Sequence, residues 1–200
     1  MNSKIKTITI TTLVLTTLLT SCGSSTNDNS KNQSQTLDTL LVTEKQTMKN
    51  VAPKKTKIFN EVSQVQSKLN EIGIGNLSQW EYDSYSWMSS SSYYIFGSAS
   101  TENGMQNNLA FYLDSQSKNF IETIELVLNV NNSAEKSQAL SLMDKTSLKT
   151  FTSLSIKMPE GLSNSIKSGK NFNSENSDFK VSLTLVESRI ETWRLAIESK

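Results

Sequence analysis

Cys22 is the only cysteine in the chain, and its thiol is the most reactive side chain that the sequence offers. A lone thiol can attack an electrophile, bind a metal or carry a covalent modification. The sequence contains no histidine, which excludes histidine-ligated metal sites and Ser-His or Cys-His nucleophiles. The surroundings of Cys22 in the sequence therefore decide which chemistry its thiol serves.

The residues before Cys22 form the pattern of a secretory signal. Two lysines give a short positive segment, and the stretch from Ile8 to Leu19 follows without a charge. At about 12 residues this apolar stretch is too short to cross a bilayer, which takes roughly 20. Small residues then precede Cys22, as a signal peptidase requires. We expect residues 1–21 to be removed from the mature chain.

Leu19, Thr20, Ser21 and Cys22 together resemble the lipobox of bacterial lipoproteins, which is a branched apolar residue, two small residues and a cysteine. The resemblance implies that the Cys22 thiol receives a diacylglyceryl group and that a signal peptidase cuts before it. Each buried methylene contributes roughly 0.8 kcal/mol and stable anchoring takes two chains, which this group supplies. The resemblance covers residues 1–22 only. The alternatives are an ordinary signal peptide in which Cys22 is incidental and an uncleaved helix.

The same resemblance implies a place in the cell envelope, with the membrane as partner through the lipid on Cys22. In lipoproteins of two-membrane bacteria, a residue other than Asp after the cysteine permits sorting to the outer membrane, and Gly23 meets that condition. The protein would then face the periplasm. In a host with a single membrane it would lie on the outer face of that membrane.

The net charge of the chain restricts the classes of partner that it can bind. Loss of Lys4 and Lys6 with the signal leaves 18 of the 20 basic residues against 19 acidic ones. A nearly neutral chain argues against nucleic acid as a partner and against a polybasic membrane patch. No cofactor, metal site or set of catalytic residues is expected.

The mature chain divides into a linker and one domain. Residues 23–36 include no apolar side chain, so this segment cannot bury a core. We expect residues 22–56 to form the lipidated N-terminus and a flexible linker, and residues 57–200 to form a globular domain.

The hydrophobic patterns of the domain alternate between helical and strand periods. Helices are expected at Lys57–Ile72, capped by Thr56 and stopped by Gly73; from Asn132, with Glu135 in a capping box, to about Leu154; and around Leu162 and Ile166, with Pro159 in the first turn and Gly169 at the end. Strands are expected at Gln79–Met88, Tyr93–Ser98, Asn107–Asp114, Phe120–Val130 and Phe179–Leu185, with Arg189–Glu198 a strand or a short helix. This order predicts an α+β fold, an antiparallel sheet with helices packed on one face.

A run of aromatic residues gives the one candidate binding surface. Trp80, Tyr82, Tyr85 and Trp87 are expected on one strand of a hairpin whose loop is the serine run Ser89–Ser92. Strand alternation would place Trp80 and Tyr82 on one face and Tyr85 and Trp87 on the other. One pair would fill the core and the other could stack on a sugar or a partner protein. The alternative is that both pairs are buried.

Paired carboxylates are the only candidates for catalysis. Glu81 and Asp83 would share a strand face, as would Glu187 and Glu191, and two carboxylates can hydrolyse a glycosidic bond. The simpler interpretation is a solvated surface, with Glu187, Arg189 and Glu191 forming surface ion pairs.

Three functions fit these patterns. The favoured one is a non-catalytic binding or envelope-maintenance lipoprotein whose partner is an envelope protein or a glycan. The alternatives are a carboxylate-dependent enzyme acting on envelope polymers and an immunity or exclusion factor that binds a toxin or a phage component. A carboxylate pair in a shared cleft would favour the enzyme, and an exposed strand rich in rings would favour binding.

Overall fold

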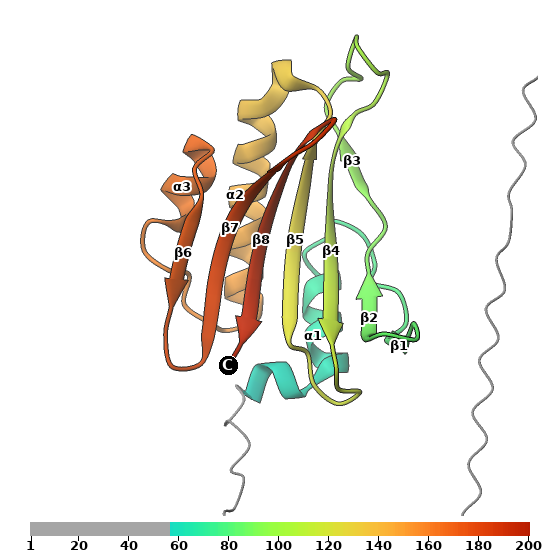
Figure 1. Ribbon diagram of the computed structural model, residues 1–200, viewed down its shortest axis with the longest axis vertical. Helices are drawn as coiled ribbons and strands as arrows, with labels where there is room; N and C mark the ends of the chain where they lie inside the picture. Colours follow the sequence, from blue (N-terminus) through green and yellow to red (C-terminus); the bar gives the residue numbers. More distant parts are fainter. Residues whose placement is uncertain (1–56) are drawn as a thin grey trace, which may run out of the picture. The chain divides into compact units, whose positions relative to one another are not determined.

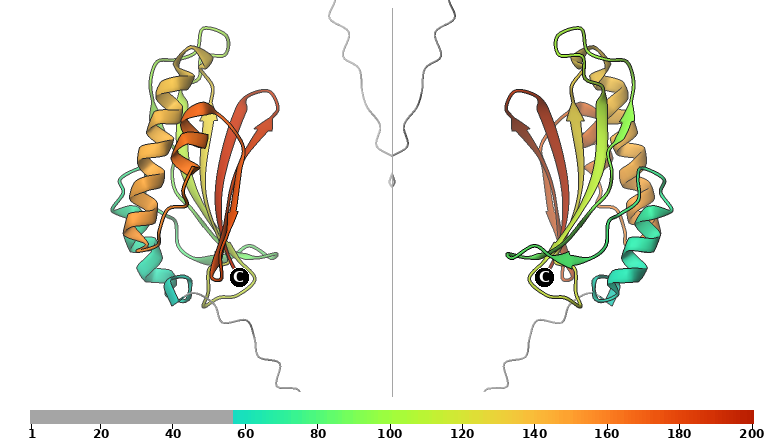
Figure 2. Two further views of the ribbon diagram at one scale, coloured as in Figure 1. Left: turned by 90° about the vertical axis from the view of Figure 1, so that its left-hand side faces the viewer. Right: turned by 90° about the vertical axis from the view of Figure 1, so that its right-hand side faces the viewer.

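The structure, a computed structural model, describes residues 57–200. In this range the chain forms an eight-stranded antiparallel sheet with three α-helices, so the α+β class expected from the sequence is confirmed (Figure 1). The helices lie together on one side of the sheet, as Figure 2 shows. The expected signal peptide, the lipobox at Cys22 and the linker to residue 56 lie outside the described residues.

Two hairpins, β4 with β5 and β7 with β8, form the centre of the sheet. The strand order is β1-β2-β4-β5-β8-β7-β6, and β3 pairs with β4 on the same side as β2. β8 joins the hairpins, because it pairs with β5 as well as with β7. The strands are β1 (Glu81–Tyr82), β2 (Trp87–Ser90), β3 (Tyr94–Phe96), β4 (Asn107–Ser115), β5 (Thr123–Val130), β6 (Phe172–Glu175), β7 (Phe179–Glu187) and β8 (Glu191–Ser199).

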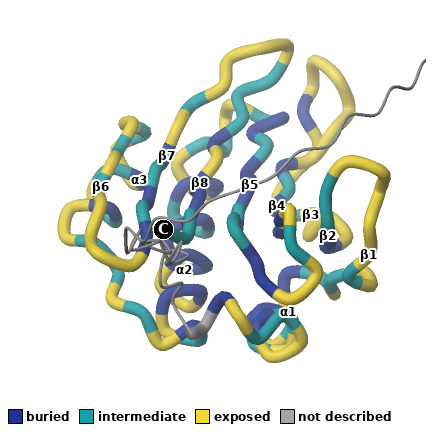
Figure 3. Tube along the Cα trace, turned by 60° about the horizontal axis from the view of Figure 1, so that its bottom comes forward, coloured by how far each residue is buried: buried dark blue, intermediate teal, exposed yellow. Residues whose placement is uncertain are grey.

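Alternation along the central strands separates a core face from an open face. In β5, Ile124, Leu126, Leu128 and Val130 are buried beneath the helices, as their shared parity predicts. The other parity of β5 carries Glu125, Val127 and Asn129 and faces away from the helices, as expected for a sheet covered on one side. Figure 3 shows the buried segments concentrated in the central strands and in α2.

The helices that cover the core face are shorter than the patterns predict. They are the 3₁₀ helices η1 (Lys57–Asn60) and η2 (Ser133–Glu135) and the α-helices α1 (Val62–Asn70), α2 (Lys136–Ser153) and α3 (Leu162–Ser168). Two buried hydroxyls of α2 find their partners within the helix, because Ser147 and Thr150 donate to the carbonyl oxygens of Met143 and Thr146, at 2.7 and 2.9 Å.

The expected helix Lys57–Ile72 is interrupted at Glu61, which has φ of −118° and ψ of 70°. The carbonyl oxygen of Phe59 accepts a hydrogen bond from the Ile121 amide at 2.8 Å. That contact takes the carbonyl out of the helical ladder, and the ladder starts again at Val62. Gly73, with φ of +83°, follows the end of α1 as predicted.

Three further expectations need correction. Asn132 accepts a hydrogen bond from the Ala134 amide, but no capping box forms, because the Glu135 carboxylate accepts from the Ser98 amide at 2.9 Å instead. Pro159 precedes α3 rather than lying in its first turn. Strand β6 has no counterpart in the prediction, because Phe172 is the only apolar side chain it contains. The segment Arg189–Glu198, left open between strand and helix, contributes β8.

Candidate functional site

The predicted hairpin, in which the strand Gln79–Met88 pairs with the strand Tyr93–Ser98 through the serine run, is wrong. β2 turns back on β1, with Tyr82 opposite Trp87, and β3 pairs with β4. The turn lies at residues 83–86, where the Asp83 carboxylate accepts hydrogen bonds from the Tyr85 and Ser86 amides at 2.9 and 3.0 Å. These amides lower the pKa of Asp83. The hairpin is therefore closed by an aspartate turn and not by the serine run.

This turn changes which rings lie together. Trp80 stacks on Trp87 with 6.5 Å between ring centroids, and Tyr82 lies 5.9 Å from Trp87 at 45°. Tyr85 lies in the turn and is 82% exposed. The predicted division into Trp80 and Tyr82 against Tyr85 and Trp87 is therefore wrong, because three of the four rings form a single group.

Lys118 completes this group from the loop between β4 and β5. Its ammonium nitrogen lies 5.4 Å from the centroid of the Trp87 ring, a cation–π distance. Its carbonyl oxygen accepts a hydrogen bond from the indole nitrogen of Trp80 at 2.8 Å. Trp80, Tyr82, Trp87 and Lys118 are called the tryptophan cluster below. The loop contact fixes the orientation of the Trp80 ring.

A groove of about 600 Å³ lies beside Trp80. Residues from the beginning of α1 also line it, among them Val62, which packs against the core. Polar side chains line the rest, namely Asn60, Glu61, Ser63, Gln64, Gln66, Lys118 and Asn119. Gln66 also donates to Ser78 and Ser89, at 2.9 and 3.0 Å, so it ties α1 to the segment that carries the rings. The groove therefore combines one aromatic wall with carboxamide and hydroxyl groups.

Sequence reasoning missed a second polar hollow, of about 330 Å³, on the open face of the sheet. Its floor carries an ion pair between Arg194 and Glu125, with Nη1 3.0 Å from Oε2. The Tyr112 and Tyr93 hydroxyls lie 3.4 Å apart at its rim, and burial, followed by this contact, raises the pKa of Tyr112 to about 12. The alternating polar residues of β4, β5 and β8 indicate an open sheet face in the sequence. Which of these residues lie next to each other depends on the strand order, which the sequence pattern does not give.

The candidate carboxylate pairs do not form an acid/base site. The Asp83 carboxylate accepts the hydrogen bonds that close the β1–β2 turn, as described above. Glu187 and Glu191 are opposite each other in the β7–β8 hairpin, but Lys136 lies 2.8 Å from the Glu191 carboxylate.

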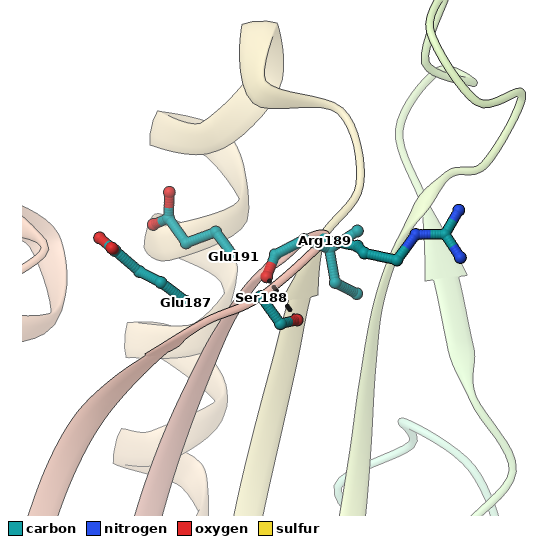
Figure 4. A pocket seen from close by; sticks show the side chains of 5 residues that line it. Glu187, Ser188, Arg189 and Glu191 are labelled. Atoms are coloured by element: carbon teal, nitrogen blue, oxygen red, sulfur yellow. Dashed lines mark hydrogen bonds between the residues drawn. The ribbon is translucent and has the colours of Figure 1, made fainter.

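The β7–β8 turn contains a hollow of about 280 Å³ that consists of five consecutive residues, Glu187 to Glu191. Figure 4 shows Arg189 pointing away from both glutamates, so the predicted ion-pair series is wrong. The Ser188 hydroxyl donates to the Ile190 carbonyl oxygen at 3.4 Å and closes the turn locally. This hollow is a feature of one turn, with no side chain from another element.

Within residues 57–200 no three acidic side chains come close enough to hold a metal ion. In the same range no helix is both long and apolar enough to span a membrane. No family model matches the chain, and no curated protein or solved structure is significantly similar to it. The site has to be interpreted from its own chemistry.

Proposed function

We propose that this protein is a lipid-anchored lipoprotein of the bacterial cell envelope whose domain binds a ligand without catalysis. The anchor rests on the lipobox at Leu19 to Cys22. The observation that supports binding is the groove beside Trp80, which is lined by an indole ring held by a hydrogen bond and by polar side chains. Rings and polar groups that converge in a concave surface are typical of ligand sites.

The ligand class that this groove fits best is a neutral glycan of the envelope. A sugar ring has an apolar C–H face that packs on an aromatic ring, and hydroxyls that need both donors and acceptors. Carboxamides supply both, and Asn60, Gln64 and Asn119 line the groove. Glu61 and Lys118 bring one charge of each sign, so the lining has no net charge and suits an uncharged ligand.

The groove lacks the pair of carboxyl groups that hydrolysis of a glycan would need. Hydrolysis of a glycosidic bond by the common mechanisms needs two carboxyl groups about 5–9.5 Å apart. Glu61 is the one carboxylate in the lining. The groove therefore supports recognition of a glycan and not its cleavage.

The test is calorimetric titration of the processed chain with soluble fragments of envelope glycan strands. Trp80→Ala and Asn119→Ala should each weaken binding about two- to tenfold, since loss of a ring contact or a hydrogen bond to a ligand costs about 0.5–1.5 kcal/mol. Tyr85→Ala is the matched control, because this ring belongs to the same hairpin but lies outside the groove. Unchanged affinity in Trp80→Ala, or an equal loss in Tyr85→Ala, would remove the groove as the site.

A further inference from the structure

β3 is an outer strand with a free edge. Within residues 57–200 it pairs only with β4, and no other backbone hydrogen bond joins Tyr94, Ile95 or Phe96 to another segment. Figure 1 shows β3 beside β4 with no described strand along its other edge, so the amide and carbonyl groups of that edge are unpaired. Such an edge is a template for a further strand, and proteins usually protect it with charges, proline or a covering segment.

β3, a strand of three residues, carries neither a charge nor a proline, whereas the other outer strands carry charges. The chain from Ser84 to Thr101 contains neither a charged residue nor a proline. By contrast, β1 carries Glu81, and β6 ends in Glu175, which pairs with Lys200 at 2.5 Å. An unprotected edge among protected ones is a departure from the usual pattern, and such departures concentrate at functional surfaces.

The side chains of this edge are apolar and exposed on both faces of the sheet. Ile95 lies opposite Asn108, which places it on the open face, and 60% of it is exposed. Tyr94 lies opposite Leu109, on the helix side, and is 40% exposed. Its ring stacks on Phe96 with 6.2 Å between centroids. Together with Tyr93, at 57% exposed, these residues form an apolar edge that a partner strand would cover.

We propose that β3 pairs antiparallel with β3 of a second copy of this chain, about a twofold axis at Ile95. The two sheets then continue into one. In this register Ile95 faces the partner's Ile95 on the open face, and Tyr94 faces the partner's Phe96 on the helix side. The paired segment ends at Phe96, because the chain bends at Gly97, which has φ of +76° and the Glu135 carboxylate close beside it.

The occupant is a second copy because the strand is complementary to its own reverse. Aromatic and β-branched residues opposite each other stabilise a sheet, whereas like charges opposite each other destabilise it. Antiparallel pairing of a charged strand with itself about a central charge would bring like charges together. The segment Tyr94 to Phe96 avoids this problem and places a ring opposite a ring in both aromatic pairs. A closed twofold contact of this kind also ends the assembly at two copies.

Disulfide trapping in cells that express the full chain tests the proposal. Opposite residues of an antiparallel pair have Cα atoms about 4.5–5.5 Å apart, within the range that a disulfide spans. Ile95→Cys should give a product of twice the chain mass on a non-reducing gel, which reductant removes. Leu148→Cys on α2 and Val186→Cys on β7 are exposed to 57% and 44% and serve as matched controls. They should stay monomeric, as should the chain with Cys22 alone.

The register has its own test. Co-expressed Tyr94→Cys and Phe96→Cys chains should form a mixed dimer, while either variant alone should form far less. Trapping of Leu148→Cys to the same extent as Ile95→Cys would show random collision and overturn the proposal. A disulfide between Ile95→Cys and a different protein, or no dimer in either experiment, would overturn it as well.

Discussion

Alanine substitutions in the β1–β2 hairpin should separate the three clustered rings from the fourth. The variants are Trp80→Ala, Tyr82→Ala, Tyr85→Ala and Trp87→Ala. Tyr85 is 82% exposed, so its loss should change the free energy of unfolding by less than about 0.5 kcal/mol. Tyr82 is 56% exposed and contacts Trp87, so its loss should cost about 0.5–1.5 kcal/mol, the contribution of an aromatic pair.

The two tryptophans should be more costly. Truncation of a fully buried Trp costs about 3–5 kcal/mol, and both indoles are half-buried, so about 2 kcal/mol is expected for Trp87→Ala. Trp80→Ala also loses the hydrogen bond to the Lys118 carbonyl, which adds about 1 kcal/mol. A double-mutant cycle on Trp80 and Trp87 should give a coupling energy of about 0.5–1.5 kcal/mol, because their rings stack.

Urea denaturation followed by far-ultraviolet circular dichroism measures these values. The chain is expressed without residues 1–21 and with Cys22→Ser, which removes the thiol. The cycle on Tyr85 and Trp87 is the control and should show no coupling. If Tyr85→Ala destabilises the domain as much as Trp87→Ala, or if Tyr85 couples to Trp87 while Trp80 does not, the arrangement of rings described above is refuted.

Three further changes have defined outcomes. Gly97→Ala should cost about 1.5 kcal/mol more than Gly104→Ala, because both glycines have positive φ but only Gly97 has the Glu135 carboxylate against it, and thermal melts of the two variants compare them. The pKa of Tyr112 is raised from 10.0 to about 12, so the unfolded chain ionises first as pH rises through this window, and stability should fall there. Tyr112→Phe should show a smaller fall, and an identical pH profile would contradict this assignment. Deletion of residues 24–36 should leave the melting temperature nearly unchanged, because the segment has no apolar side chain to bury, and a large drop would contradict the linker assignment.

The sequence could predict those helices and strands whose hydrophobic residues recur with a clear helical or strand period. Leu109, Phe111 and Leu113 alternate in β4 and lie buried as expected, and Leu162 and Ile166 mark α3 correctly. Strand order could not be predicted in this way. The pairing of β8 with β5 joins residues about 70 positions apart, as in Arg194 with Glu125, and no local pattern encodes it.

Of the four rings predicted as a binding surface, only Trp80 lines the groove, and the arrangement of the rings was not predicted. The serine run looks like a loop, yet Ser89 is buried in β2, where its hydroxyl donates to the Ser78 carbonyl oxygen at 2.7 Å. A small hydroxyl can replace an apolar side chain when its hydrogen bond is satisfied. The true turn carries a weaker signal, Asp83 followed by Ser84 with φ of +87°. The groove beside Trp80 also depends on α1 and the β4–β5 loop, which only the tertiary fold brings together.

A single measurement tests directly whether the protein is anchored to a membrane through Cys22. The proposed envelope ligand requires a place outside the cytoplasm, so the proposed function depends on whether Cys22 is lipidated. Mass spectrometry of the intact chain extracted from membranes should give a polypeptide that begins at Cys22 and carries a diacylglyceryl group, and Cys22→Ala should give the longer, unmodified precursor. A mature chain that begins at another residue, or an unmodified Cys22 in a membrane-bound chain, would contradict the account.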